Sequence, residues 1–489
     1  ACAMQVDGSS IVTPLAAPTS DSKVYSSYGA RGDDDTENSL AEELGVRPYS
    51  SLVAFSMCLN LIIGTGCFGL PYAVKEAGLL LTPMLLVVGG VIALVSMNFT
   101  IEALARADAY FKAKNGEAEG GTPDYRIGYR KFDFSRIAEL FSGPHGMLFC
   151  QVVIVIYGLG TLWGFASMFS SSAASLLLSY GFDESCNAYA EAPGLGCNAA
   201  YFASLAAFSL VVVTMVLRDV SKQAFVQKIL TIYRIVALTI MLVTMATKVS
   251  LSSTLVAKRA SDIGYARWSM FSKGFGPSIL AINCHYNMPD ALQPLHSSEK
   301  PNARVVTFAA IIVSIVLYLG LGILGALAFD DVNPLISLNW GAFTGCGLSG
   351  WERCQGEGHG AQSVTGMTIQ LMIQLFPMLN VVSAYPLIGV SMGDNVAMSV
   401  PAIAVPSWMK HLAPAETGCG ANASTRLFAG GNIANSNVTV GARIGARLLC
   451  AVPPLLLAAC FRRLDLILSI AGILGFLLSL TVGRKIQMS

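Results

Sequence analysis

Two apolar stretches of the chain, 51–73 and 270–293, are interrupted by residues that bring hydrogen-bonding groups or remove side chains. The interrupting residues are two amides, two glycines, a threonine and a histidine, namely Asn60, Gly64, Thr65, Gly66, Asn283 and His285. Glycine lets a ligand approach the backbone closely, and an interrupted helix leaves N–H groups and carbonyls available to bind it. The pattern therefore predicts binding of a small polar ligand inside an apolar environment.

The composition places these stretches in a membrane. Of the 489 residues, 54% are hydrophobic and 12% are charged, and the mean hydropathy is +0.59. A soluble domain usually carries about 25% charged residues, so a water-soluble enzyme is excluded. The formal net charge of +1 gives no field that would attract nucleic acid, which removes DNA and RNA as partners.

Ten stretches are long and apolar enough to cross a bilayer, and each should be helical because lipid offers no partners to the backbone. We expect them at 51–73, 79–101, 146–178, 200–217, 225–247, 270–293, 304–329, 364–393, 441–460 and 464–483. They form one membrane domain over 51–485, whereas residues 1–50 are polar and acidic and should be a disordered tail.

The loops between the spans predict the orientation. With a cytoplasmic N-terminus, 20 of the 31 Lys and Arg residues fall on the cytoplasmic side and 9 on the other, as the positive-inside rule favours. Four cysteines lie in loops on that other side: Cys186, Cys197, Cys346 and Cys354. Proximity favours pairing within each loop, although four cysteines allow three connectivities and free thiols are the alternative.

Charged residues inside the spans are few. Arg234 lies only six residues after Lys228 and can snorkel to the interface, so it requires no functional role. No span carries a row of arginines or a ring of acidic residues, which makes a channel less favoured, and no phosphate-binding loop indicates ATP hydrolysis.

The interrupted spans are the first and the sixth, five apart, which is typical of secondary transporters built from inverted five-helix repeats. We therefore predict an all-α polytopic membrane protein with this broken-helix transporter fold. The alternative is that the glycines only permit close packing between helices, as small residues do in many membrane proteins. The matching interruption five spans later favours the binding interpretation.

Three segments resemble one family. The run from Asn60 to Ala73, followed by Glu76-Ala-Gly78, is similar to the first helix of the amino acid/auxin permease family, especially its sodium-coupled neutral amino acid transporter branch. The segment 283–289 resembles the sixth helix of that branch, and Phe376-Pro-Met378 with Ser383 resembles the eighth. The resemblance covers about residues 51–485. It implies eleven helices, so we expect an eleventh to be missing from this sequence.

The resemblance also implies roles for individual residues. Substrate would meet Gly64, Thr65, Gly66, Asn283 and His285, and a sodium ion would be held by Asn60, Asn380 and Ser383. His285 is either a hydrogen-bonded neutral histidine or a pH sensor. Replacing Gly66 with valine should block the substrate carboxylate and leave folding largely intact.

We thus expect a secondary active transporter of neutral amino acids, with no catalytic residues and no cofactor other than Na⁺ or H⁺ as the coupling ion. An amino acid sensor, a proton-coupled vacuolar exporter and a passive channel are the alternatives. The protein should be a monomer surrounded by membrane lipid, in the plasma membrane or in a vacuolar or lysosomal membrane.

Overall fold

The computed structural model is mainly helical in the parts of the chain that it describes. These are residues 48–114, 127–130, 132, 134–182, 184, 186–190, 192–217, 224–283, 288–352, 354, 362–399 and 440–487. In these ranges the only strand-like pairings are two isolated bridges, Tyr49 with Leu295 and Cys346 with Glu352. The predicted all-α class is confirmed. The predicted tail lies almost wholly outside the described residues.

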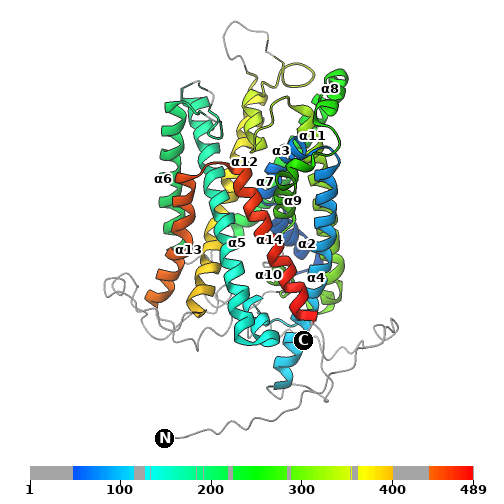
Figure 1. Cartoon of the computed structure of the whole chain (residues 1–489), viewed down its shortest axis with the longest axis vertical. Helices are drawn as coiled ribbons and strands as arrows, with labels where there is room; N and C mark the ends of the chain where they lie inside the picture. Colours follow the sequence, from blue (N-terminus) through cyan, green and yellow to red (C-terminus); the bar gives the residue numbers. More distant parts are fainter. Residues whose placement is uncertain are drawn as a thin grey trace.

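The helices follow the predicted spans in order (Figure 1). The first span comprises α2 (Ser51–Ile62), the 3₁₀ helix η2 (Thr65–Gly69) and α3 (Leu70–Ala77), and the sixth comprises α9 (Phe271–Ile282) and α10 (Met288–Leu292). The others are α4 (Leu81–Lys114), α5 (Phe134–Gly181), α6 (Leu195–Leu217), α7 (Ala224–Leu251), α11 (Ala303–Ala328), α12 (Val364–Ser399), α13 (Val440–Cys460) and α14 (Leu464–Gln487). Among the described residues, seven helices are long and apolar enough to cross a membrane, or eight if the bent first pair counts as one.

Shorter helices connect the long ones: α8 (Ser253–Ile263), η4 (Trp268–Met270), η6 (Ser297–Asn302) and η7 (Ile336–Ala342). The predicted start of the third span, at 146, lies just after a break inside α5. The backbone of Gly143, with a φ of 68°, is not helical, and Pro144 follows it, so α5 consists of two helices that meet at a kink. The shorter helix, which begins at Phe134, precedes the predicted span.

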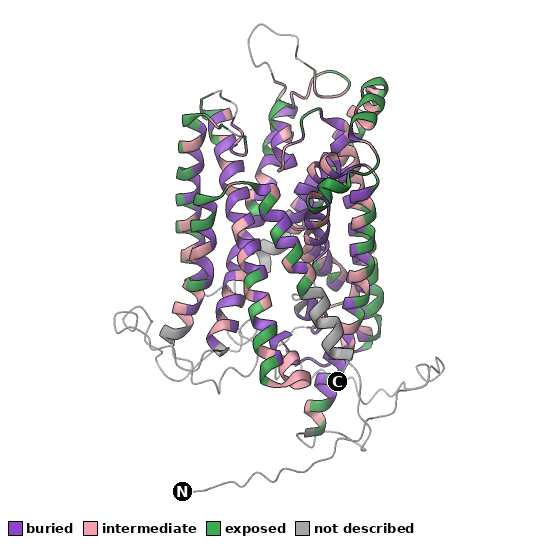
Figure 2. Cartoon of the chain, in the orientation of Figure 1, coloured by how far each residue is buried: buried purple, intermediate pink, exposed green. Residues whose placement is uncertain are grey.

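Large apolar side chains are exposed along the outer faces of the long helices, and buried residues fill the interior (Figure 2). Leu210 of α6 is 71% exposed, Val316 of α11 is 63% exposed and Val91 of α4 is 55% exposed. Contiguous apolar surface of this extent is unfavourable in water and matches the hydrocarbon of a bilayer. The chain is an integral membrane protein.

The two largest apolar cores of the described residues divide most of the helices into two groups. The larger core is formed mainly by α2, α4, α9, α10 and α11 with part of α7 and includes Met97, Met241 and Ile311. The second core is formed by α5, α6, α12 and α13 and includes Tyr201 and Tyr385. Figure 1 shows α6 and α13 of the second group on one side of the bundle and α4 and α11 of the first group on the other, with α5 and α12 between them. The two interrupted spans belong to the same group.

The halves of the interrupted spans are joined in pairs at opposite ends. At one end, Tyr49, just before α2, donates its hydroxyl to the carbonyl of Ala291 at 2.7 Å, and the N–H of His296 donates to the carbonyl of Tyr49 at 3.0 Å. At the other end, Lys273 of α9 forms an ion pair of 2.6 Å with Glu76 of α3. The breaks therefore lie between two fixed ends.

Candidate binding site at the helix breaks

The first span breaks over two residues. The helix α2 ends at Ile62, η2 begins at Thr65, and Gly64 between them is extended, with φ −109° and ψ −161°. The helix axes on the two sides differ by 47°. In the sixth span α9 ends at Ile282, and Asn283 follows in an extended conformation. His285 lies outside the described residues.

The second half of the first span begins without a capping side chain. Gly64 stands at the N-cap of η2 and has no side chain that could accept a hydrogen bond from the first turn. A Cβ added to Gly64 would have only one neighbour within 4 Å, the carbonyl oxygen of Ile62 at 3.8 Å. The backbone N–H groups of this turn are therefore open to an acceptor that approaches at Gly64.

Gly66 has a different environment. A Cβ added to this residue would lie 2.9 Å from the Cα of Ala281 and 3.0 Å from its backbone nitrogen. Gly66 is thus the point where η2 packs directly on the backbone of α9. The expectation that valine is tolerated here is wrong, because its side chain would collide with backbone atoms that cannot move aside. Gly66 therefore permits close helix packing, whereas the backbone at Gly64 is open.

Most carbonyls at the break already have partners. The carbonyl of Ile62 accepts hydrogen bonds from the hydroxyl of Tyr318 on α11 and from the N–H of Gly64, both at 2.7 Å. The thiol of Cys67 donates to the carbonyl of Gly64 at 3.1 Å. A carbonyl has two lone pairs, so that of Ile62 is saturated. The break consequently offers hydrogen-bond donors more than acceptors.

Arg234 of α7 points inward to this break. The expectation that it snorkels to the membrane interface is therefore wrong. Its side chain is buried, with a residue exposure of 5%, and its Nη1 donates to the carbonyl of Asn60 at 3.0 Å. The same nitrogen donates to the amide oxygen Oδ1 of Asn60. Among the described residues no carboxylate forms an ion pair with Arg234. The sequence did carry a signal for a functional role of Arg234, because a charged residue deep inside an apolar span usually has one.

The other two predicted sodium ligands lie on α12 and do not join Asn60. The hydroxyl of Ser383 donates to the carbonyl of Asn380 at 2.8 Å, within the helix. In the described part of the chain neither residue forms a hydrogen bond with Asn60. The helix α12 reaches the break instead through Phe376, whose ring meets that of Phe68 in η2 edge to face at 4.9 Å.

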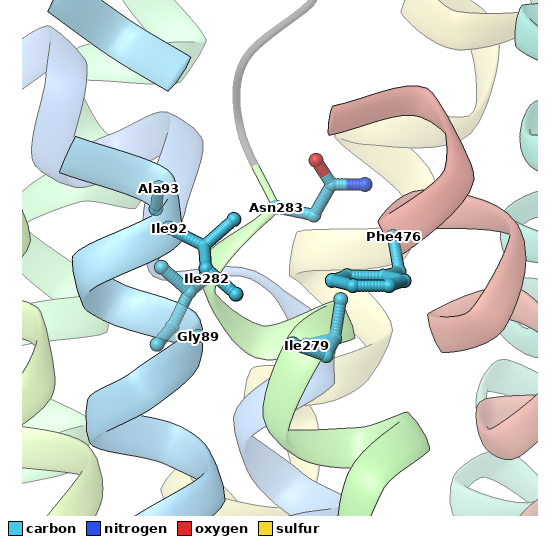
Figure 3. Close-up of a pocket in the computed structure, with 7 residues that line it drawn as sticks. All are labelled: Gly89, Ile92, Ala93, Ile279, Ile282, Asn283 and Phe476. Atoms are coloured by element: carbon cyan, nitrogen blue, oxygen red, sulfur yellow. The ribbon is translucent and has the colours of Figure 1, made fainter. Parts of the chain in front are cut away.

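Asn283 provides the polar side chain at the second break. It borders a small pocket between α4, α9 and α14 that is otherwise lined by apolar residues and one glycine: Gly89, Ile92, Ala93, Ile279, Ile282 and Phe476 (Figure 3). A Cβ added to Gly475 of α14 would lie 2.3 Å from the amide nitrogen of Asn283 and 3.0 Å from the ring of Tyr157. The missing side chain at Gly475 makes room for both.

Two disulfides stabilise the loops at one end of the bundle. Cys186 is bonded to Cys197, and Cys346 is bonded to Cys354. The first loop is held close to η7 because the amide nitrogen of Asn187 donates to Oδ1 of Asn333 at 2.7 Å. Both disulfides therefore lie at the end of α11 opposite to its start, where Tyr49 is bound.

An all-helical membrane bundle with two cores and two broken helices defines the class of broken-helix secondary transporters. The chain belongs to the family described as transmembrane amino acid transporter protein, which matches residues 47–481. The predicted resemblance to the amino acid/auxin permeases is thereby confirmed, and the protein is a transporter and not an enzyme. The match identifies the family, and the sodium-coupled branch stays a prediction.

Individual relatives share about a quarter or less of their residues with this chain. The chain is 25% identical over 364 residues to a transmembrane protein 104 homolog of Caenorhabditis briggsae, covering 71% of this chain and 68% of that protein. It is 22% identical over 393 residues to transmembrane protein 104 of Homo sapiens, covering 71% and 74%. A solved structure, that of MhsT in complex with L-phenylalanine, gives a TM-score of 0.42 at 12% identity and covers 89% of this chain and 99% of that one.

Proposed function

We propose that this protein is a secondary active transporter that moves neutral amino acids across its membrane, using an ion gradient of sodium or protons. The observation that carries the proposal is the uncapped and sterically open turn that follows Gly64. A carboxylate of a small zwitterion is an acceptor that this turn can bind, because free N–H groups and the helix dipole both favour a negative charge.

The surroundings of this turn strengthen the preference for a carboxylate. The guanidinium of Arg234 binds the backbone of Asn60, one turn before Gly64, so the break carries a full positive charge. In a region of low dielectric, this charge favours an anionic group nearby. Residues with acidic side chains are absent from the sequences of α2, η2 and α9.

The substrate ammonium needs acceptors from another part of the site. The saturated carbonyl of Ile62 does not supply one, so we assign the ammonium to the second break, beginning at Asn283. The side-chain amide and the backbone carbonyl of Asn283 are neutral oxygen acceptors. A single ammonium can be bound by carbonyls, whereas a second positive charge on the substrate would favour an added carboxylate. The site therefore favours amino acids with no net charge.

Transport would follow from movement of one helix group against the other. The breaks lie in the group formed by α2, α4, α9, α10 and α11, and η2 touches α12 of the second group through the Phe68–Phe376 contact. Phe376 belongs to the larger core with Phe68, whereas Tyr385, further along α12, belongs to the second core, so α12 connects the two groups. Rocking of the two groups about α12 would open the site first to one side and then to the other.

We further propose that the N-terminus is cytoplasmic, in the plasma membrane or a vacuolar or lysosomal membrane. Tyr49 and the two disulfides lie at opposite ends of α11, a helix of 26 residues that spans about 39 Å at 1.5 Å per residue. Disulfides persist on the side of a membrane away from the cytosol.

Uphill accumulation in proteoliposomes tests the function. Purified protein should concentrate a labelled neutral amino acid inside the vesicles when a sodium or proton gradient is imposed, and should release it when the gradient is dissipated. A passive channel would only equilibrate the amino acid, and a sensor would bind it without any flux. Either of these results would contradict the proposal.

A further inference from the structure

The interior of the bundle contains one arginine whose charge has no acidic partner in the described part of the chain. Arg234 lies on α7, is 5% exposed, and uses Nη1 to contact both oxygens of Asn60. Its Nε is buried and makes no hydrogen bond to any described residue. An arginine remains protonated at physiological pH, so this is a permanent positive charge inside the membrane domain.

The contact places this charge where the sequence resemblance assigned a sodium ion. Sodium would require the amide oxygen of Asn60, and that oxygen already accepts a hydrogen bond from the guanidinium. A second cation at the same oxygen would be in contact with a fixed like charge, which is strongly unfavourable in a medium of low dielectric. The residues present therefore do not fit a sodium ion at Asn60.

The other two predicted ligands, Asn380 and Ser383, lie on α12. The hydroxyl of Ser383 donates to the carbonyl of Asn380 at 2.8 Å, and in the described part of the chain neither residue forms a hydrogen bond with Asn60. The guanidinium of Arg234 at Asn60 is therefore the observation that excludes sodium there.

We propose that Arg234 is a built-in cation that replaces sodium at the first helix break, so that amino acid transport by this protein does not depend on sodium. The guanidinium fixes the end of α2 to α7, as a bound ion would fix it. It also supplies the positive charge that attracts the substrate carboxylate. This inference rests on the proposed transport function, which it deepens by naming the residue that takes over the role of the ion.

Uptake by the full-length protein in proteoliposomes gives the first test, with sodium chloride or N-methyl-D-glucamine chloride outside at equal concentration. The ratio of the initial rates should be about 1, because the site has no place for the ion. Arg234→Met, which removes the charge and keeps much of the volume, should reduce uptake by at least about tenfold in both salts. Arg234→Lys should retain more uptake than Arg234→Met, since it keeps the charge.

Arg447→Met is the matched control. Arg447 on α13 is also partly buried, but it forms a two-point ion pair with Asp394 of α12, at 2.9 Å for each contact. This variant should keep the wild-type rate ratio. Stimulation of wild-type uptake by sodium, or normal uptake by a folded Arg234→Met variant, would overturn the proposal. If Arg234→Met does not fold, the wild-type rate ratio still decides.

Thermal unfolding of the purified protein separates this inference from the transport function. A specific ligand raises the unfolding temperature, so wild-type protein should unfold at the same temperature in both salts. A sodium-specific increase would overturn the inference about Arg234, even if the protein is a transporter. If no amino acid is accumulated under any gradient, the proposed function fails, and the thermal measurement still tests the role of Arg234.

Discussion

The guanidinium of Arg234 donates hydrogen bonds from one nitrogen to both the backbone carbonyl and the side-chain oxygen of Asn60, 174 positions earlier in the sequence. The contact joins the end of α2 to α7 directly before the first helix break. It replaces the snorkelling expected for Arg234 and changes what Asn60 can do. An amide oxygen that accepts a hydrogen bond from a fixed cation is not free to bind a second cation.

Loss of this contact should destabilise the protein. Asn60→Ala removes one acceptor from a buried guanidinium, and hydrogen bonds to charged groups contribute about 1.5–3 kcal/mol. We expect the variant to unfold at a lower temperature. The double variant Asn60→Ala/Arg234→Met should lose less stability than the two single variants together, because both remove the same contact. Additive losses in thermal unfolding would contradict the contact.

Tyr318→Phe tests whether the break must be fixed for transport. The variant deletes only the hydroxyl that binds the carbonyl of Ile62, and should cost about 1 kcal/mol of unfolding free energy. The matched control is Tyr385→Phe, since Tyr385 is equally buried and its hydroxyl binds the carbonyl of Ala451 at 2.7 Å in the second core. Both variants should lose similar stability, and only Tyr318→Phe should reduce uptake. Equal uptake in the two would show that Tyr318 is only structural.

The two glycines of the break should respond differently to alanine. Gly64→Ala should fold, because its Cβ has 3.8 Å of clearance, and should raise the KM for amino acids by about tenfold by crowding the carboxylate. Gly66→Ala should lower the unfolding temperature, because its Cβ would lie 2.9 Å from the backbone of Ala281. Thermal unfolding and uptake kinetics on both variants check this. A stable Gly66→Ala protein would contradict the observed packing.

Asp330, after the end of α11, should make stability depend weakly on pH. Hydrogen bonds from Arg259, at 2.6 and 2.7 Å, lower the pKa of this carboxyl below its usual value of 3.8. The stabilisation is therefore fully present above pH 3.8 and is lost as pH falls through the lowered pKa. Because the Asp330 side chain is 81% exposed, solvent screening should limit the effect to at most about 1 kcal/mol.

Thermal unfolding over a series of pH values measures this effect. The difference between wild type and Asp330→Asn should shrink as the solution becomes acidic. Asp331→Asn is the control, since Asp331 forms no ion pair with any residue that the structure describes. A difference that stays constant with pH would refute the assignment to Asp330.

The two disulfides predict the labelling of cysteines on the side of the membrane away from the cytosol, which is the outside of the cell for a plasma-membrane protein and the lumen for an organelle. On intact cells that carry the protein at their surface, a membrane-impermeant thiol reagent should label Cys346 and Cys354 only after reduction, without permeabilisation. In Cys346→Ala the partner Cys354 should be labelled without reductant, because its thiol is then free. If permeabilisation is required for labelling of the protein at the cell surface, the N-terminus is not cytoplasmic.

The sequence by itself determined the elements of the fold. Apolar runs of about 20 residues specify helices in lipid whatever their neighbours are, because the bilayer leaves the backbone no other way to satisfy its hydrogen bonds. The breaks are equally local, since Gly64 interrupts one helix and Asn283 ends another where the sequence becomes polar. The transporter fold followed from the spacing of these two breaks, and the family followed from the resemblance of three segments to the amino acid/auxin permeases.

Only the tertiary structure decided how the residues of the site are used. Gly64 and Gly66 are the same residue type two positions apart, yet one is open and the other packs on Ala281. The partner of Arg234 depends on which face of α7 meets α2, and many helix arrangements are compatible with the same apolar pattern. Contacts between distant residues arise from the packing of whole helices. Local propensity carries little information about such contacts, so the positive charge at the break was visible only in the folded molecule.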